Sequence, residues 1–75
     1  MKKNVITKIA EISETDPNLV KPDTELMDLE SWDSLANVTF VAYAISEYGV
    51  KLTADEMLDA KTVSDLIRLV ESKLL

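Results

Sequence analysis

The chain has 75 residues, of which 14 are acidic and 8 are basic, and it has no histidine, so its formal net charge is −6. Without cysteine or histidine it lacks the usual zinc ligands, a thiolate nucleophile and the usual general base of enzyme sites. The negative charge disfavours nucleic-acid binding, and no apolar run reaches the roughly 18 residues of a membrane span. We therefore expect a single cytoplasmic domain, residues 1–75, that is not an enzyme.

The composition and the first apolar pattern favour helices. Apolar residues make up 47% of the chain, and one glycine and two prolines are too few for a series of tight β-turns. Within residues 2–14, apolar side chains recur at i, i+4 and i+7, which is the spacing of one helix face. This stripe consists of Val5, Ile9 and Ile12, with Ile6 beside it. We expect the Asp16-Pro17 pair to end this helix, because the residue before a proline is pushed out of the α region.

Residues 16–33 show no clean period and carry six acids against one base, Lys21. The acids are Asp16, Asp23, Glu25, Asp28, Glu30 and Asp33. We interpret the segment as a long ordered loop pinned to the core, since a loop of this length in a compact domain is uncommon and often functional. The expected anchors are Leu19, Val20, Leu26, Met27 and Leu29. The acids are expected to face water, with the steering of basic partners as an alternative role.

The second predicted helix covers residues 34–48, with Asp33 or Ser34 as N-cap and Gly49 after its last turn. A helical wheel predicts a core-facing stripe of Phe40, Val41, Ala44, Ile45 and Tyr48. The opposite side is also apolar, with Leu35, Val38 and Ala42. Either the helix is buried on both sides, or this second stripe is an exposed docking surface for other proteins. So short a chain has few helices to enclose another, which favours the docking surface.

Two capping signals predict the remaining helices. Thr53 and Glu56 have the spacing of a capping box and begin a short helix over residues 54–59. Thr62 and Asp65 repeat the spacing and begin a last helix that runs to about residue 74. Its expected core face is Val63, Leu66, Ile67, Val70 and Leu74. Val50 and Leu52 are expected to return the chain to the core. The predicted fold is all-α, a bundle of three longer helices and a short third one, with a long first loop.

The triplet Asp33-Ser34-Leu35 opens the second of four expected helices, directly after an acidic loop. In this setting the chain resembles acyl carrier proteins and the related peptidyl carriers. The likeness extends over nearly the whole chain and includes its length, the helix order and the glycine after the second helix. By this resemblance, Ser34 is joined to 4′-phosphopantetheine by a phosphopantetheinyl transferase. Asp33 would assist the transferase and its metal, and Leu35 would contact the transferase.

The chemistry of the residues is compatible with that role. A phosphodiester on Ser34 would lie at a helix N-terminus, where backbone amides and the helix dipole favour an anion. Because the chain has no thiol, thioester chemistry requires a cofactor that brings one. For Ser34 and for Asp33, a plain helix cap is the alternative. Trp32 is expected to pack its ring over the loop and the start of the helix, with contact to the cofactor arm or a partner as the alternative.

Two departures from the family point to its specialised members. Carriers of bacterial fatty-acid synthesis usually have several acids early on the second helix, but here those positions are Ala36 and Thr39, and the helix keeps only Glu47. The loop before Ser34 is also one residue longer than the common fatty-acid form. The chain therefore resembles carriers of polysaccharide acylation, polyketide or aminoacyl-thioester synthesis.

The resemblance also implies partners. We expect a monomer that binds the transferase, an acyl- or aminoacyl-loading enzyme and a downstream transferase or synthase. The expected partner surface is Leu35, Ala36, Val38, Thr39 and Ala42. The alternative is a small acidic regulatory module that binds a basic partner and carries no cofactor.

Overall fold

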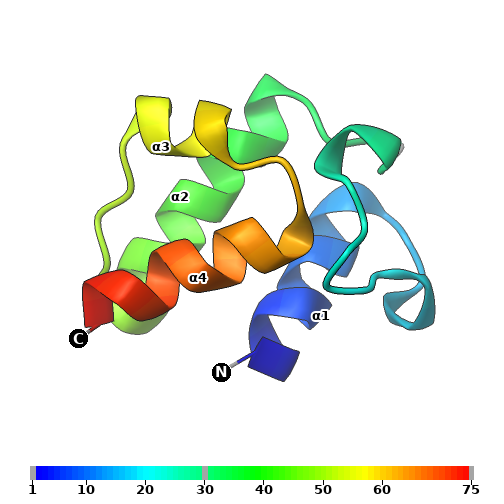
Figure 1. Cartoon of the computed structure of the whole chain (residues 1–75), viewed down its shortest axis with the longest axis horizontal. Coiled ribbons are helices and arrows are strands. Elements are labelled where there is room, and N and C mark those ends of the chain that lie inside the picture. Colours follow the sequence, from blue (N-terminus) through cyan, green and yellow to red (C-terminus); the bar gives the residue numbers. More distant parts are fainter. Residues whose placement is uncertain (1, 30, 75) are drawn as a thin grey trace.

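The computed structural model describes residues 2–29 and 31–74. Four α-helices and two short 3-10 helices follow one another along this part of the chain (Figure 1). They are α1 (Lys2–Ser13), η1 (Pro17–Leu19), η2 (Leu26–Asp28), α2 (Ser34–Tyr48), α3 (Ala54–Asp59) and α4 (Val63–Leu74). The predicted all-α bundle of three longer helices and a short third one is confirmed. One acid of the first loop, Glu30, lies outside the described residues.

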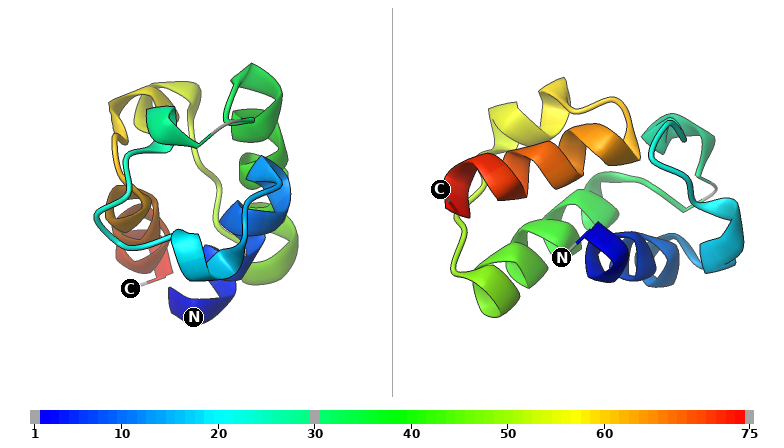
Figure 2. Two further views of the ribbon diagram at one scale, coloured as in Figure 1. Left: turned by 90° about the vertical axis from the view of Figure 1, so that its right-hand side faces the viewer. Right: turned by 60° about the horizontal axis from the view of Figure 1, so that its bottom comes forward.

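The three longer helices enclose the core. α1 packs against α2 and α4, and α2 also packs against α4. The short α3 lies on the side of α2 and α4 that faces away from α1, and the long first loop closes one end of the bundle (Figures 1 and 2). Fully buried large side chains come from all three longer helices: Phe40, Ile9, Leu66, Val5, Val63 and Val70.

α1 has the predicted apolar face but ends one residue early, and its ending differs from the expectation. Glu14 takes a left-handed backbone conformation with φ of 55°. The amide of Thr15 then donates to the carbonyl of Ala10 at 2.9 Å, and the amide of Glu14 donates to the carbonyl of Glu11 at 3.2 Å, as in a Schellman motif. The helix is therefore closed before the proline, and Asp16 instead caps the following 3-10 helix by accepting from the amide of Asn18.

The first loop is ordered and anchored, as predicted, but by fewer side chains. Three of the five expected anchors are buried, namely Val20, Leu26 and Leu29. The other two predictions were wrong, because Leu19 and Met27 are exposed, Met27 to 90%. Each lies within a 3-10 helix of three residues. Because such a helix has three residues per turn, its successive side chains point in different directions and cannot all face the core.

α2 has the predicted bounds, but its buried face is rotated from the expected one. The buried residues are Ala36, Phe40 and Ala44, which recur at i, i+4 and i+8. Val41 and Tyr48 are only partly buried, and Ile45 is exposed to 50%, so its expected place in the core was wrong. Gly49 ends the helix with φ of 66°, in the left-handed region.

The last two helices begin at the predicted caps. Thr53 and Glu56 form a complete capping box at α3, and the side chains of Thr62 and Asp65 exchange hydrogen bonds with each other's backbone amides at α4. Val50 and Leu52 are buried, as expected. The face of α4 is also as predicted except at Leu74, the last residue of the helix, which is 46% exposed, so its expected place in the core was wrong.

Candidate functional site

Ser34 is the first residue of α2, and its side chain is exposed. The neighbouring Asp33 is the N-cap: its Oδ1 atom accepts from the amide of Ala36 at 3.0 Å. Of the two candidates for this cap, the structure therefore selects Asp33. Ser34 Oγ makes no hydrogen bond to any described residue, so its hydroxyl is available at the positive end of the helix dipole.

Trp32 supports this turn from the core side, as predicted. Its ring is partly buried, and its centroid lies 6.3 Å from that of Phe40 with the planes tilted by 58°. Its amide donates to the carbonyl of Leu29 at 3.2 Å, which ties it to an anchor of the first loop. Trp32 thereby connects the end of the first loop to the core face of α2, two residues before Ser34.

The outer face of α2 is apolar and exposed. Leu35 is exposed to 72% and Val38 to 65%, and Thr39 and Ala42 are exposed as well. Ala36 was wrongly assigned to this surface: only 4% of it is exposed, because it lies one turn before Phe40 on the buried face. The helix is therefore not buried on both sides. We call Leu35, Val38, Thr39 and Ala42 the outer face of α2.

Two grooves meet at Ser34 and share Asn37 of α2 and Met57 and Leu58 of α3. The first groove has a volume of 380 Å³, and its other lining residues are all apolar, so we call it the apolar groove. Those residues are Val38, Val41, Leu52 and Ala54. The second groove has a volume of 350 Å³ and lies toward the first loop, so we call it the loop groove. Its other lining residues are Glu25, Leu26, Met27, Trp32, Asp33, Ala60 and Lys61.

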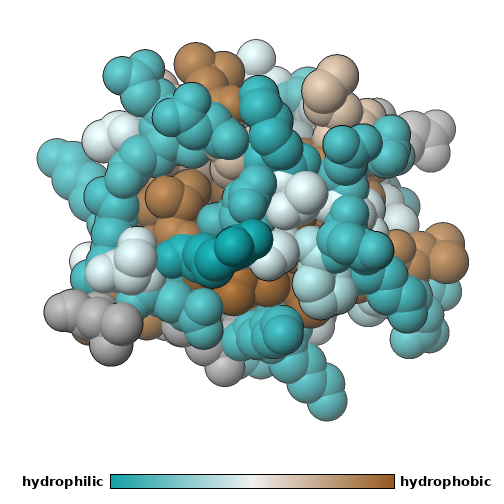
Figure 3. Space-filling model, viewed as in Figure 1, coloured by the Kyte–Doolittle hydropathy of each residue, from teal (hydrophilic) through white to brown (hydrophobic). Residues whose placement is uncertain are grey.

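These grooves add residues that the sequence analysis missed. Met57 is buried and Leu58 is exposed to 67%, and both line the two grooves together with Ser34. The only signal in the sequence is the apolar pair in an otherwise acidic short helix. On the face shown in Figure 3, hydrophobic side chains likewise reach the surface in patches between charged and polar ones.

The charges around the site are mixed rather than arranged to hold a metal. Asp33 and Glu25 lie on the loop groove, and Lys61 is the base that lines it. Within residues 2–29 and 31–74, no three acidic side chains lie close enough to one another to form a metal site. The role that the resemblance gives Asp33 beside the metal of a transferase stays a prediction.

The sequence model of a family described as "Phosphopantetheine attachment site" matches residues 3–70, which is nearly the whole chain. The chain belongs to the acyl carrier protein family. Acyl carrier proteins of Rickettsia massiliae, Rickettsia felis and Rickettsia canadensis are each 29% identical to it over 73 residues, which are 97% of this chain and 85% of each relative.

Membership of this family confirms the predicted carrier role and its covalently attached cofactor, 4′-phosphopantetheine. It also implies a phosphopantetheinyl transferase and acyl-handling enzymes as partners. The residues present fit the cofactor, because the exposed hydroxyl of Ser34 lies at a helix N-terminus beside two grooves and makes no hydrogen bond to a described residue. In the described part of the chain, none of the helices has the length and apolarity that a bilayer crossing requires.

Proposed function

We propose that the chain is a single carrier domain and that Ser34 holds the phosphopantetheine arm through a phosphodiester on Oγ. The observation that supports this proposal is that Asp33, and not Ser34, caps α2. Asp33 caps the helix, so the Ser34 hydroxyl is exposed and makes no hydrogen bond within the described chain. When bound, the arm supplies the thiol that this chain lacks, and that thiol carries an acyl or aminoacyl group as a thioester.

The backbone at the start of α2 favours an anion on Ser34, although the carboxylates of Asp33 and Glu25 lie on the adjoining groove. The unpaired amides of the first helical turn and the positive end of the dipole of α2 favour an anion on Ser34. After the N-cap Asp33, the first turn of α2 adds no further acid that would repel a phosphodiester. The carrier itself catalyses no step in this proposal: its residues position the arm and present its cargo to separate enzymes.

We further propose that the partner enzymes dock on the outer face of α2. Leu35 lies directly beside Ser34 and is the expected contact of the transferase. Its neighbours Val38, Thr39 and Ala42 continue an uncharged surface along the helix, which has a single acid, Glu47, near its far end. Apolar, uncharged contacts of this kind suit partners that do not depend on a basic patch.

The uncharged outer face of α2 supports a role in a specialised pathway, such as polysaccharide acylation, polyketide or aminoacyl-thioester synthesis. Mass spectrometry of the intact protein, purified from its own cells with the thioester preserved, would identify the cargo. An aminoacyl or polyketide group, or another acyl group that is not an elongation intermediate, is expected. A population that carries only the intermediates of fatty-acid elongation would contradict the specialised role and leave the carrier role intact.

The attachment is tested by incubating the purified protein with coenzyme A and each of several broad-specificity phosphopantetheinyl transferases. The intact mass should rise by one phosphopantetheine, and Ser34→Ala should abolish the rise. Ser31→Ala is the matched control, because Ser31 is a nearby serine in the preceding turn, where its Oγ donates weakly to Glu14 Oε2 at 3.5 Å. An unchanged mass with every transferase would favour the cofactor-free acidic module, and modification of Ser34→Ala would place the arm elsewhere.

A further inference from the structure

Two grooves between α1 and α2 continue the outer face of α2 on the side away from α3. The first has a volume of 260 Å³, and its lining includes Ile12, Glu14, Asp33, Leu35 and Thr39. The second has a volume of 480 Å³, and its lining includes Lys8, Thr39, Ala42, Tyr43 and Glu47. Because Thr39 lines both, the two grooves adjoin, and we call them together the α1–α2 seam.

The end of the seam beside Ser34 carries only negative charge. Glu14 and Asp33 line this groove, and its other lining residues are uncharged. The backbone of Glu14 is fixed, because it closes α1 with φ of 55° and its amide donates to the carbonyl of Glu11. Its carboxylate accepts only a weak bond from Ser31 at 3.5 Å within the described chain, and Asp33 uses Oδ1 alone as the cap of α2. A cation of a partner would therefore find free carboxylate oxygens here.

The other end of the seam carries charges of both signs. Lys8 and Glu47 line it, and the Nζ atom of Lys8 lies 3.4 Å from Oε2 of Glu11 and 5.4 Å from the ring centroid of Tyr43. The ion pair and the contact with the ring hold the ammonium at this end. A partner's cation would be repelled by Lys8 while Glu47 attracts it, so it gains less here than beside Ser34.

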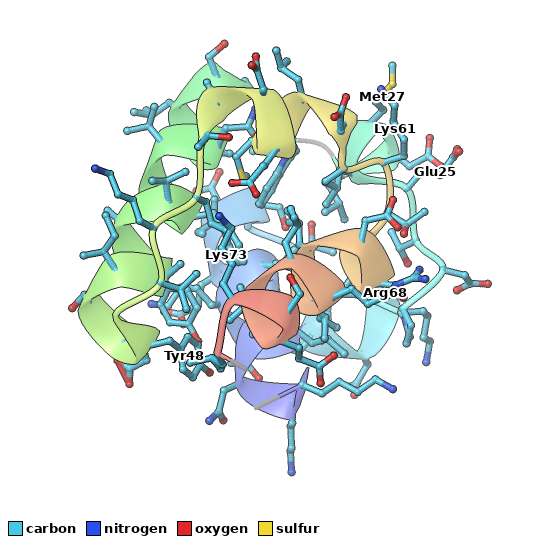
Figure 4. All side chains as sticks on the ribbon, turned by 60° about the vertical axis from the view of Figure 1, so that its left-hand side comes forward. Glu25, Met27, Tyr48, Lys61, Arg68 and Lys73 are labelled. Carbon is cyan, nitrogen blue, oxygen red and sulfur yellow. The ribbon has the colours of Figure 1, made fainter. Side chains whose placement is uncertain are left out.

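The middle of the seam is uncharged, and it is separate from the loop groove. From Leu35 to Ala42, the side chains of α2 that line it are apolar or carry a hydroxyl. This stretch is about 10 Å long at the rise of an α-helix, which is room for a short segment of another protein. Tyr48 packs edge-on against Tyr43 at the far end, and in Figure 4 it lies well away from Met27 and Lys61 of the loop groove.

We propose that the phosphopantetheinyl transferase places one of its segments along the α1–α2 seam, with a single arginine or lysine over Glu14 and Asp33 and apolar side chains over the middle. The transferase must bring its own active site to Ser34 Oγ, whereas enzymes that act on the cargo meet it at the end of the arm. The unequal charges of the two ends set the direction of the segment. This inference rests on the proposed attachment at Ser34 and adds α1 to the docking surface.

The first experiment measures kcat/KM for the unmodified protein with coenzyme A and a purified transferase that modifies the wild type. Glu14→Lys should lower kcat/KM by about tenfold, chiefly by raising KM, because two cations would then face each other. Glu71→Lys makes the same change of charge at an exposed residue of α4, outside the seam, and should stay near the wild-type value. Circular dichroism melting curves establish that each variant is folded before it is compared.

A charge exchange then identifies the pair. Each arginine and lysine near the active site of the transferase is replaced in turn by glutamate. One of these changes should slow the modification of the wild type and restore Glu14→Lys to near the wild-type rate, which a mere loss of stability could not do. When the labelled, unmodified protein is titrated with transferase in the absence of coenzyme A, the NMR signals of the Ile12, Glu14 and Thr39 amides should shift.

The other outcomes overturn the inference. Equal rates for Glu14→Lys and Glu71→Lys would mean that only net charge matters, and a slow Glu14→Lys that no transferase variant restores would exclude the paired cation. Shifts at Met57 and Leu58 without any at Ile12 or Glu14 would place the transferase on the side of α3. In these cases the attachment would stand, because the wild type is modified. If no transferase modifies the wild type, the proposed attachment and this inference fail together.

Discussion

The Nζ atom of Lys73 lies 3.0 Å from Oε2 of Glu56, so the last turn of α4 is tied to the first turn of α3. The same carboxylate caps α3: its Oε1 accepts from the amide of Thr53 at 2.9 Å. A helix of six residues is too short to be stable by itself and depends on such contacts. Because Met57 and Leu58 of α3 line both grooves, the Glu56–Lys73 pair also holds the common wall of the candidate site.

This arrangement predicts an acid dependence of stability. The hydrogen bond from the Thr53 amide, and then the one from Lys73, hold the pKa of Glu56 below its ordinary value. The carboxylate therefore stabilises the fold above its unfolded-state pKa of about 4.3, and this contribution is lost as the pH falls through the lower folded-state pKa. Glu56→Gln should melt at a lower temperature at neutral pH and show a flatter decline in acid.

Glu71→Gln is the matched control, because Glu71 is exposed on α4 and belongs to no capping box. Part of the acid dependence should persist in Glu56→Gln. Asp65 accepts from the amides of Lys61 and Thr62, which likewise hold its pKa below the ordinary value. Thermal melts of the three proteins between neutral and acidic pH measure these differences, and identical slopes for the two variants would contradict the role of Glu56.

The N-cap of α2 predicts different effects for two adjacent residues. Asp33→Ala removes the acceptor for the Ala36 amide and should cost about 1 kcal/mol of unfolding free energy. Ser34→Ala removes a hydroxyl that bonds no described residue and should leave that free energy almost unchanged. Asp33→Asn should recover most of the loss, since asparagine is an equally good cap. Urea denaturation measures all three, and a larger cost at Ser34 than at Asp33 would refute the assignment of the cap.

The two faces of α2 predict a second contrast. Val38→Asp places its charge in water and should change the unfolding free energy little. Phe40→Asp buries an unpaired charge where no surface is exposed, which should cost several kcal/mol of the roughly 5–15 kcal/mol that hold a small domain together. Val41→Asp should fall between them, because Val41 is only partly buried. Circular dichroism should therefore show Val38→Asp folded and Phe40→Asp largely unfolded.

The same variant tests the docking surface. Val38→Asp should accept the phosphopantetheine arm more slowly than the wild type, although it is folded, because the outer face of α2 then carries a charge. Lys51→Asp, which adds an acid at an exposed residue beyond the helix, should be modified at the normal rate. If the Val38→Asp protein is modified as fast as the wild type, the transferase does not bind the outer face of α2.

Gly49 provides a prediction that concerns the backbone alone. Its φ of 66° lies in the left-handed region, and a Cβ atom added there would meet no atom within 4 Å. Gly49→Ala should therefore cost about 1 kcal/mol from backbone strain without any steric clash. Gly49→Asn should cost less, because asparagine tolerates this conformation better. Thermal melts measure this cost. A loss of several kcal/mol of unfolding free energy in Gly49→Ala would indicate that the added Cβ atom clashes with its surroundings.

The helices and the place of Ser34 could be predicted from the sequence because their signals are local. Thr53 and Glu56 are three residues apart, and the capping box they form depends on little beyond that turn. The same holds for Gly49, whose freedom to adopt positive φ ends α2 wherever the helix packs. The triplet Asp33-Ser34-Leu35 likewise lies within one helical turn. The place of Ser34 at the start of α2 therefore depends only on residues next to it in the sequence.

Only the tertiary structure decided which side of α2 is buried and what surrounds Ser34. α2 is apolar on two sides, so its own pattern allowed Ala36 on the surface and Ile45 in the core. The positions of α1 and α4 reversed both assignments, because a side chain is buried by its neighbours rather than by its own helix. The loop groove depends likewise on a hydrogen bond between Leu26 and Lys61, which are distant in the chain and meet only when the whole core has formed.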